Sequence, residues 1–393
     1  MFASCKSKKV EYIHPLDIKQ IHKNEVDLFY KHKADSIITQ INDININRFK
    51  KVATIGESSD SFEYYFFQTI PSKIDIDNSN RIYISRESFN SISVYNRDGI
   101  YIYSIGRGGR GPGEFQRVID FEFSNDKKEL YVLDFFEIEK FTLEGDEYVY
   151  NKSYPHNMLM VYDFCLLNDK MYLSGYRTKR EKADSLVTLT TDEKLKKKVA
   201  PPISTFNLSD FTYLNSFGFE YLSNSGYGTF DGVLSKNYIT CNPSTNTIIG
   251  YQADFSYIFG YNTLGEQKWV TKIADYINAE HTEFKSPEYK NTGLIQYSNS
   301  GIFNRKLPIP TINMGKYEIL QFLYQTPQKY FADFDSSESK SNIETLLIDS
   351  ESGFINKLDY SSKSLGFLNR EKLIAIKQDQ KTFDTEVIIY EKH

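Results

Sequence analysis

The stretch Tyr101–Leu133, YIYSIGRGGRGPGEFQRVIDFEFSNDKKELYVL, decides the fold of this chain. It begins with a short apolar strand, continues through a turn rich in glycine, and ends in a second pair of strand-like runs. Strands of the same kind recur on both sides of it. The stretch therefore joins two copies of one repeated unit.

The repeat is easiest to follow by its tyrosines. Tyr83, Tyr131 and Tyr172 each lie in the middle of a short apolar run, and they are 48 and 41 residues apart. Tight turns such as Asn96-Arg97-Asp98-Gly99 separate neighbouring runs, and Asp-Gly between alternating runs is a strong hairpin signal. Four strands in about 40–50 residues are typical of the blades of a β-propeller.

Later copies follow the pattern more loosely. The third is predicted at Tyr162–Leu167, Lys170–Ser174 and Ser185–Thr190. The fourth is predicted at Tyr227–Leu234, Tyr238–Cys241, Tyr257–Tyr261 and Lys268–Ile273. The fifth is predicted at Tyr317–Tyr324, Tyr330–Phe334 and Glu344–Asp349, and the last at Leu365–Leu368, Lys372–Lys377 and Glu386–Tyr390.

The last copy has only three strands, so Phe49–Ile55 near the N-terminus is predicted to supply the fourth and protect the edges of the ring. The sequence thus predicts an all-β, six-bladed β-propeller closed by an N-terminal strand that joins the last blade. It would span residues 46–393, after an irregular lead-in over residues 1–45. Long loops are predicted near 200–222 and 276–310, and five or seven blades are the alternative counts.

Composition excludes several classes of function. The formal charge is −5, and the one dense basic run, Lys194–Lys198, is typical of a solvated hairpin tip, so nucleic acid is not expected as a partner. No apolar run approaches the ~20 residues that span a bilayer. The six histidines show no metal-binding spacing, which leaves a histidine metal site unsupported.

The three cysteines show no paired spacing, so a disulfide framework is not predicted. Cys165 and Cys241 lie in strand-like runs and are interpreted as small buried side chains. Cys5 differs, because Phe2-Ala3-Ser4-Cys5 resembles the end of a bacterial lipoprotein signal. Cys5 is therefore a candidate for lipidation, with an incidental cysteine after small residues as the alternative.

The run Ile105–Phe115, IGRGGRGPGEF, and the following VIDFEFSNDKKELYVLDF carry a family resemblance. They resemble the six-bladed β-propeller lipoproteins of Bacteroidetes, which are related to NHL-type or TolB-like propellers. The matched positions are Gly106, Gly108, Gly111, Pro112, Gly113, Glu114, Phe115, Asp120, Tyr131 and Asp134. The resemblance implies a propeller, export and a lipid anchor, with the periplasmic side favoured over the surface. It implies no catalytic residue.

The candidate ligand-binding residues lie in this glycine-rich run. Arg107, Arg110 and Arg117 are suited to bidentate binding of a carboxylate or sugar acid, and Glu114 lies among them. The alternative is that Glu114 pairs with an arginine and fixes the loop. A phosphate site is not supported, because the loop precedes a strand and lacks the P-loop motif.

Three aspartates occupy equivalent positions at the start of successive units: Asp75, Asp120 and Asp163. Such carboxylates either fix blade packing through backbone hydrogen bonds, which is the favoured interpretation, or bind Ca²⁺ or act in acid–base chemistry. No cofactor is predicted, and Ca²⁺ is supported by no motif.

Two hypotheses of function follow. The first is a monomeric, non-catalytic scaffold of the cell envelope, which binds an envelope protein or a small carbohydrate or peptide. The second is a propeller enzyme, a lyase or a hydrolase such as a lactonase acting on sugars, with a metal or carboxylate in the central channel. No catalytic residue is assigned for either.

Overall fold

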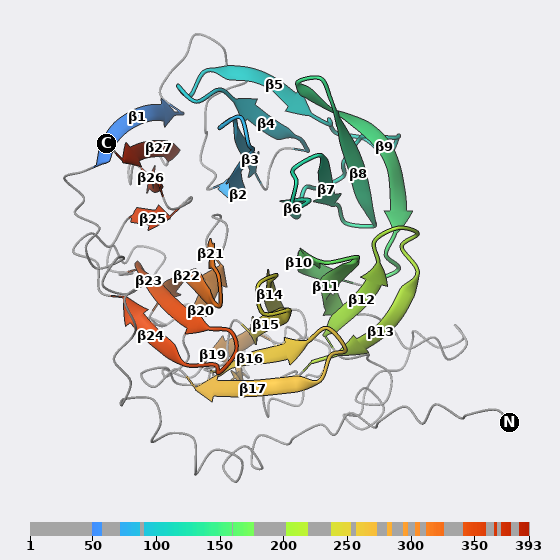
Figure 1. Cartoon of the computed structure of the whole chain (residues 1–393), viewed down its shortest axis with the longest axis vertical. Helices are drawn as coiled ribbons and strands as arrows, with labels where there is room; N and C mark the ends of the chain where they lie inside the picture. The colour runs from blue at the N-terminus through green and yellow to red at the C-terminus, as the bar shows by residue number, and fades with distance from the viewer. Residues whose placement is uncertain are drawn as a thin grey trace, which may run out of the picture.

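A computed structural model shows six β-sheets arranged around a central axis (Figure 1). The structure describes residues 49–56, 71–86, 90–158, 160–176, 202–218, 237–252, 257–272, 281–284, 294–297, 303–306, 312–325, 341–358, 365–367, 371–378 and 385–392. All regular elements in these residues are strands, as predicted. Cys5 and the predicted strands Ser185–Thr190, Tyr227–Leu234 and Tyr330–Phe334 lie outside them.

The first two blades contain the predicted tyrosine-marked strands, with Tyr83 in the second strand of blade 1 and Tyr131 in the second strand of blade 2. Blade 1 consists, from the axis outward, of β2 (Pro71–Ile76), β3 (Ile82–Arg86), β4 (Ile92–Tyr95) and β5 (Tyr101–Ile105). Blade 2 consists of β6 (Asp120–Phe123), β7 (Glu129–Leu133), β8 (Glu137–Glu144) and β9 (Glu147–Pro155). Both sheets are antiparallel throughout, because short turns join consecutive strands.

Blades 3 and 4 differ from the prediction in their strand bounds. Blade 3 consists of β10 (Met160–Leu167), β11 (Lys170–Tyr176), β12 (Ile203–Asn207) and β13 (Tyr213–Phe217). Blade 4 consists of β14 (Asn237–Asn242), β15 (Thr247–Gln252), β16 (Tyr257–Asn262) and β17 (Gln267–Lys272). The prediction of a long loop near 200–222 was therefore wrong: Ile203–Asn207 pairs with β11 along its whole length. Pro202 directly precedes this strand and does not interrupt it.

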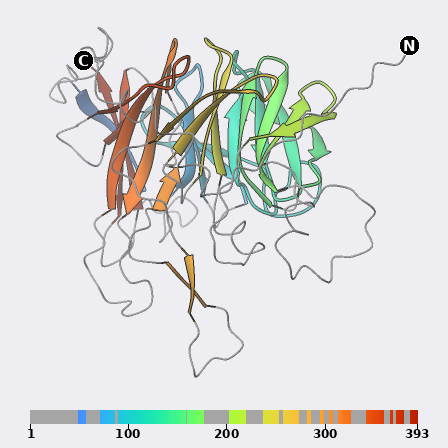
Figure 2. The ribbon, with the colours of Figure 1, turned by 90° about the horizontal axis from the view of Figure 1, so that it is seen from below.

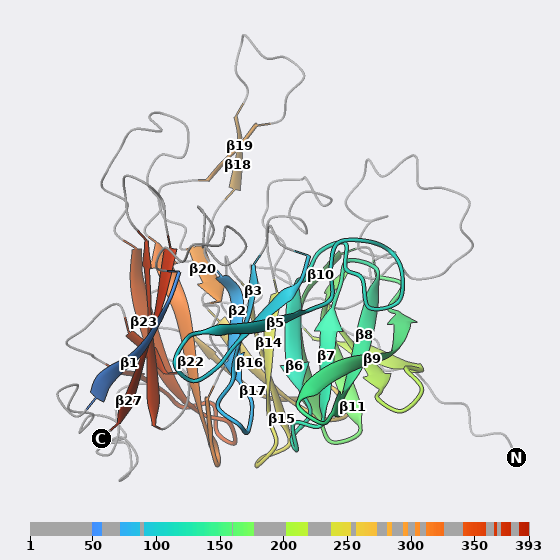
Figure 3. The ribbon, with the colours of Figure 1, turned by 90° about the horizontal axis from the view of Figure 1, so that it is seen from above.

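Blade 5 carries an addition. Its main sheet consists of β20 (Phe303–Lys306), β22 (Tyr317–Gln325), β23 (Ser341–Asp349) and β24 (Ile355–Leu358), and β21 (Ile312–Met314) also pairs with β22. Before it, β18 (His281–Phe284) and β19 (Leu294–Tyr297) form a separate hairpin that stands away from the ring (Figures 2 and 3). The region 276–310, predicted as a long loop, thus contains this hairpin and the first strand of blade 5.

Both ends of the described chain meet in blade 6. Its strands are β25 (Leu365–Phe367), β26 (Lys372–Gln378), β27 (Thr385–Lys392) and β1 (Phe49–Ile55), with β1 outermost. β1 pairs antiparallel with β27 from Phe49 opposite Lys392 to Ile55 opposite Val387. The predicted pairing of the N-terminal strand with the last blade is confirmed.

The hydrophobic core lies in layers between neighbouring blades. The tyrosines that mark the repeat, Tyr83, Tyr131 and Tyr172, are all buried, and each packs in the layer between its own blade and the next. Their strands alternate at period two, so one face of each sheet meets the preceding blade and the other meets the following one.

The two faces of the ring are built differently. At one face, here called the turn face, tight turns join the third and fourth strands, and Asn96 and Asn262 accept backbone N–H bonds at 2.9–3.0 Å from the residues two and four positions later. At the other, here called the crossover face, the outer strand of one blade leads to the inner strand of the next. The β18–β19 hairpin projects on the crossover side (Figure 3).

A disulfide joins two blades. Cys165 in β10 is bonded to Cys241 in β14, with the two Cα atoms 5.7 Å apart. The interpretation of these cysteines as unpaired buried side chains was therefore wrong. They are 76 residues apart in sequence, and only the placing of two inner strands side by side in the ring brings them together.

Candidate functional site

One carboxylate, that of Glu114, stabilises the glycine-rich crossover between β5 and β6. Glu114 accepts hydrogen bonds from Arg107 Nε at 2.8 Å, from the Gly111 amide at 2.9 Å and from the Arg110 amide at 3.1 Å. The Gly111 amide and the Arg107 guanidinium lower the pKa of Glu114 below its ordinary value. This confirms the alternative prediction, that Glu114 pairs with an arginine and fixes the loop.

Phe115 anchors the crossover between blades 1 and 2. Its side chain is fully buried, and its ring lies 5.9 Å from that of Phe141 in β8. Gly106 has φ +70°, and a Cβ at that position would lie 2.1 Å from the Phe115 ring. Glycine is therefore required there both for the backbone conformation and for the close approach of the ring.

The three arginines of the crossover are exposed to solvent. Arg107 keeps 81% of its side chain accessible even though it pairs with Glu114. Arg110 and Arg117 lie on either side of the Glu114–Phe115 anchor. The structure thus brings the four predicted site residues onto one crossover, where the arginines face water and the glutamate holds the loop.

A second element lies against this crossover: the turn Asp134–Phe136 between β7 and β8. The Asp134 carboxylate accepts the backbone amides of Gln116 at 3.1 Å and Arg117 at 2.7 Å. On the turn's other side, the buried His156 places Nε2 3.3 Å from the Asp134 carbonyl oxygen, and its amide donates to the Phe136 carbonyl at 3.3 Å. The turn is therefore fixed on two sides.

The turn presents two adjacent aromatic side chains to solvent. Phe135 and Phe136 are 41% and 55% exposed, and their rings meet edge to face at 4.9 Å. Sequence reasoning missed them. The signal was available, because two consecutive phenylalanines cannot both point to the same face of a strand.

Glu139 in β8 lies beneath both elements. Its side chain is fully buried, and neither carboxyl oxygen makes a well-formed hydrogen bond to the described residues, although the Gly113 amide lies close to the carboxyl group. Burial and the neighbouring carboxylates of Glu137 and Asp134 raise the pKa of Glu139 to about 8, while the nearby Gly113 amide opposes this shift. The raised pKa favours the protonated form of Glu139 at neutral pH.

The three predicted aspartates accept hydrogen bonds from backbone amides. Each of Asp75, Asp120 and Asp163 accepts the amide of the residue that follows it, at 2.7, 2.9 and 3.1 Å. Asp163 also accepts the Ile239 amide of blade 4 at 2.9 Å. Backbone hydrogen bonding, the favoured interpretation of these residues, is confirmed.

A buried lysine bridges blades 1 and 2 at the channel wall. Lys73 Nζ lies 2.6 Å from Glu122 and 3.2 Å from Asp120. Burial opposes its charge, but these carboxylates outweigh that cost and raise the pKa of Lys73 well above its ordinary value. Lys73 is therefore a charged structural bridge and not a nucleophilic amine at neutral pH.

A second buried carboxyl lies between blades 4 and 5. Asn242 Nδ2 donates to Glu318 at 2.9 Å, and Thr240 lies 3.4 Å from it. Burial raises the pKa of Glu318 to about 8, which these hydrogen bonds partly offset. Among the described residues, no group of three histidine, cysteine, aspartate or glutamate side chains is arranged to hold a metal ion.

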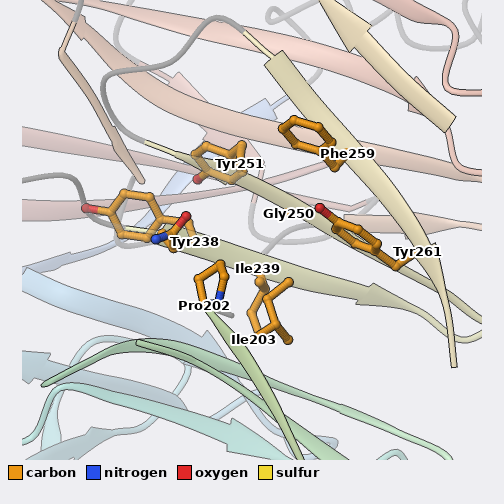
Figure 4. A pocket seen from close by; sticks show the side chains of 9 residues that line it. Pro202, Ile203, Tyr238, Ile239, Gly250, Tyr251, Phe259 and Tyr261 are labelled. Carbon is orange, nitrogen blue, oxygen red and sulfur yellow. The ribbon is translucent and has the colours of Figure 1, made fainter. Parts of the chain in front are cut away.

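A narrow pocket opens between blades 3 and 4. It is lined by Pro202, Ile203, Asn237, Tyr238, Ile239, Gly250, Tyr251, Phe259 and Tyr261 (Figure 4). Its lining is largely aromatic and aliphatic, and the room inside is about that of one water molecule. The pocket is too small for a sugar or a peptide side chain.

In the part of the chain that the structure describes, no helix has the length and apolarity needed to cross a bilayer.

Comparison with known proteins supports the fold. Residues 38–217 match the family model DUF5128, described as a 6-bladed beta-propeller. No curated protein matches the sequence.

Solved structures resemble the chain at low sequence identity. One is a member of the DUF4221 family from Bacteroides vulgatus, 9% identical, with a TM-score of 0.49 over 88% of this chain and 98% of that one. Another is the Pan2 WD40 domain of Neurospora crassa, 6% identical, with a TM-score of 0.48 over 88% and 95%. A third is a putative exported protein from Bacteroides fragilis, 13% identical, with a TM-score of 0.41 over 87% and 99%. The chain is an all-β protein with a six-bladed β-propeller fold, and residues 38–217 match a family that carries this description.

Proposed function

We propose that this protein is a cell-envelope scaffold that binds an envelope protein, or a small carbohydrate or peptide ligand, at its crossover face without catalysing a reaction. A lipid on Cys5 would anchor it on the periplasmic side of a membrane, and the propeller would act as a monomer. The observation that carries this proposal is the contrast between the channel and the crossover face.

On the inner strands of blades 1 and 2, the described charged side chains are engaged with one another or with the backbone. The aspartates hold backbone amides, and Lys73 is neutralised by Asp120 and Glu122. At the crossover face, by contrast, arginine and phenylalanine side chains are exposed while the backbone beneath them is fixed. A rigid surface with accessible recognition groups suits binding, whereas a lyase or hydrolase would need a reactive group accessible in the channel.

The disulfide supports a location in the envelope. Disulfides persist in oxidising compartments such as the bacterial periplasm and are rare in the cytosol. The Cys165–Cys241 bond therefore agrees with export, which the resemblance of Phe2–Cys5 to a lipoprotein signal also favours.

A thiol count tests this location. Protein extracted from the membrane fraction and denatured without reductant is expected to react with no maleimide, because Cys5 would carry a lipid on its sulfur and the other two cysteines are bonded. After reduction, two maleimides should add, as measured by intact mass. Protein made in a reducing cytoplasm is the control and should add three without reduction. Free Cys165 and Cys241 in the membrane-extracted protein would contradict the proposal.

Site-specific photocrosslinking tests the binding face. With p-benzoylphenylalanine in place of Phe136, the protein is expected to form discrete adducts in the cells that make it, because this position lies on the crossover face. The matched control carries the same group in place of Leu264, which is 66% exposed but lies in the β16–β17 turn at the turn face. Adducts are measured by mass shift and identified by mass spectrometry. Equal adducts from both positions, or none from position 136, would remove the proposal.

A further inference from the structure

We infer that the crossover and the adjacent turn form one recognition surface for an acidic polypeptide segment that presents an apolar side chain. This surface, here called the arginine–phenylalanine surface, consists of Arg107, Arg110, Arg117, Phe135 and Phe136. The inference rests on the proposed function for the choice of face. It adds the chemistry of the partner.

The two elements behave as one surface because hydrogen bonds join them directly. The Asp134 carboxylate accepts two consecutive amides of the crossover, so the backbone of Arg117 is fixed beside the phenylalanine turn. Glu139 lies close to both, since the Gly113 amide of the crossover and the carboxylates of Asp134 and Glu137 all act on its carboxyl group.

The surface is organised before any partner arrives. Glu114 fixes the loop that carries Arg107 and Arg110, and His156 supports the turn that carries Phe135 and Phe136. A loop that is already ordered loses little conformational entropy on binding. The fixed backbone therefore favours recognition over a merely structural crossing.

The arginines are the most exposed charged side chains of this surface, although the whole chain carries −5. All three arginines are exposed, whereas Asp134 is buried and Glu114 and Glu137 are only partly accessible. Exposed guanidinium groups bind carboxylates through paired, charge-assisted hydrogen bonds. A complementary partner is therefore acidic at this point.

The phenylalanines indicate a polypeptide more than a saccharide. The planes of the two rings stand at 79° to one another, so the two rings cannot both lie flat against one sugar ring. Such a pair instead offers an apolar contact for a single side chain. Aromatic and arginine side chains are both enriched in the energetic centres of protein–protein interfaces.

The experiment is a selection of random 12-residue displayed peptides on the full chain. Enriched peptides should carry aspartate or glutamate next to an aromatic or aliphatic residue. The dissociation constant of one synthetic enriched peptide is then measured by fluorescence polarisation. Phe136→Ala and Arg110→Glu should each weaken binding about tenfold or more. Thermal melting shows whether each variant keeps its fold.

The controls alter one exposed apolar and one exposed basic side chain on the turn face. Leu264→Ala removes an exposed apolar side chain, and Lys128→Glu reverses a charge whose side chain is 76% exposed, so each should change the affinity less than about twofold. Enriched peptides without acidic residues, or with equal affinity for all variants, would overturn the inference. No enrichment at all would also overturn it.

An oligogalacturonate measured in parallel distinguishes the other class of partner. If this saccharide binds and Arg110→Glu abolishes its binding, the inference of a polypeptide is wrong, whereas the proposed binding face still stands. If no crosslinks form at position 136, the proposed function itself is wrong. The two failures are therefore separate results.

Discussion

Replacing Phe115 by alanine is expected to lower the free energy of unfolding by about 3–5 kcal/mol, the range for removal of a buried phenylalanine ring. Phe115 is fully buried and packs beside Phe141 in the layer between blades 1 and 2. Its backbone is tied to the crossover as well, since its amide donates to the Arg107 carbonyl at 2.8 Å. Because the surrounding strands are fixed by their own pairing, the space left by the ring collapses only in part.

Urea unfolding of the full chain, followed by circular dichroism, measures this loss. Phe135→Ala is the matched control, because it removes the same ring from the adjacent turn, where the side chain is 41% exposed. That variant should change stability by less than about 0.5 kcal/mol. A loss below about 1 kcal/mol for Phe115→Ala would show that the ring does not hold the two blades together.

The strands could be predicted from the sequence wherever paired strands are also close together in the chain. Tyr83, Tyr131 and Tyr172 recur because each second strand must fill the same layer, and the pairing of Phe49–Ile55 with the last blade follows from the need to protect strand edges. The prediction failed at Ile203–Asn207, where a long connection separates two strands that pair. Prolines before a strand look the same in sequence as prolines in a loop.

The candidate site was predictable only in part, for a related reason. Arg107, Arg110, Glu114 and Arg117 lie within eleven residues, so one glycine-rich motif locates them together. Phe135, Phe136 and His156 join them only through contacts between distant segments. The Cys165–Cys241 bond has the same origin, since two separate blades must be placed side by side before the cysteines can meet.

The second large effect is a dependence of stability on pH that originates at Glu139. The folded protein holds this proton up to about pH 8, whereas an unfolded chain releases it near its ordinary value of 4.5. Below that value both states are protonated, and the protein has its full stability. As the pH rises from about 5 to 8, the unfolded state alone gains the free energy of ionisation, so stability falls by up to about 1.4 kcal/mol per pH unit.

Glu139→Gln removes this dependence, because a neutral amide of similar shape replaces a carboxyl that must stay protonated in the fold. The variant should exceed the wild type by less than about 1 kcal/mol at pH 5 and by up to about 5 kcal/mol at pH 8.5 if the whole shift is expressed. Urea midpoints at pH 5, 7 and 8.5 measure the difference. The control is Glu144→Gln at the exposed end of the same strand, which removes an exposed carboxyl group and should change stability by less than about 0.5 kcal/mol.

Ionisation of Glu139 should also affect the crossover face. Once Glu139 is ionised, its charge repels Asp134 and Glu137, and Asp134 holds the Arg117 backbone against the phenylalanine turn. Alkaline pH should therefore loosen the turn before it unfolds the ring, and Glu139→Gln should prevent this. Amide hydrogen exchange at Gln116 and Arg117, corrected for the intrinsic effect of pH, is the measurement. Equal protection in wild type and variant at pH 8.5 would show that the buried carboxyl does not control the turn.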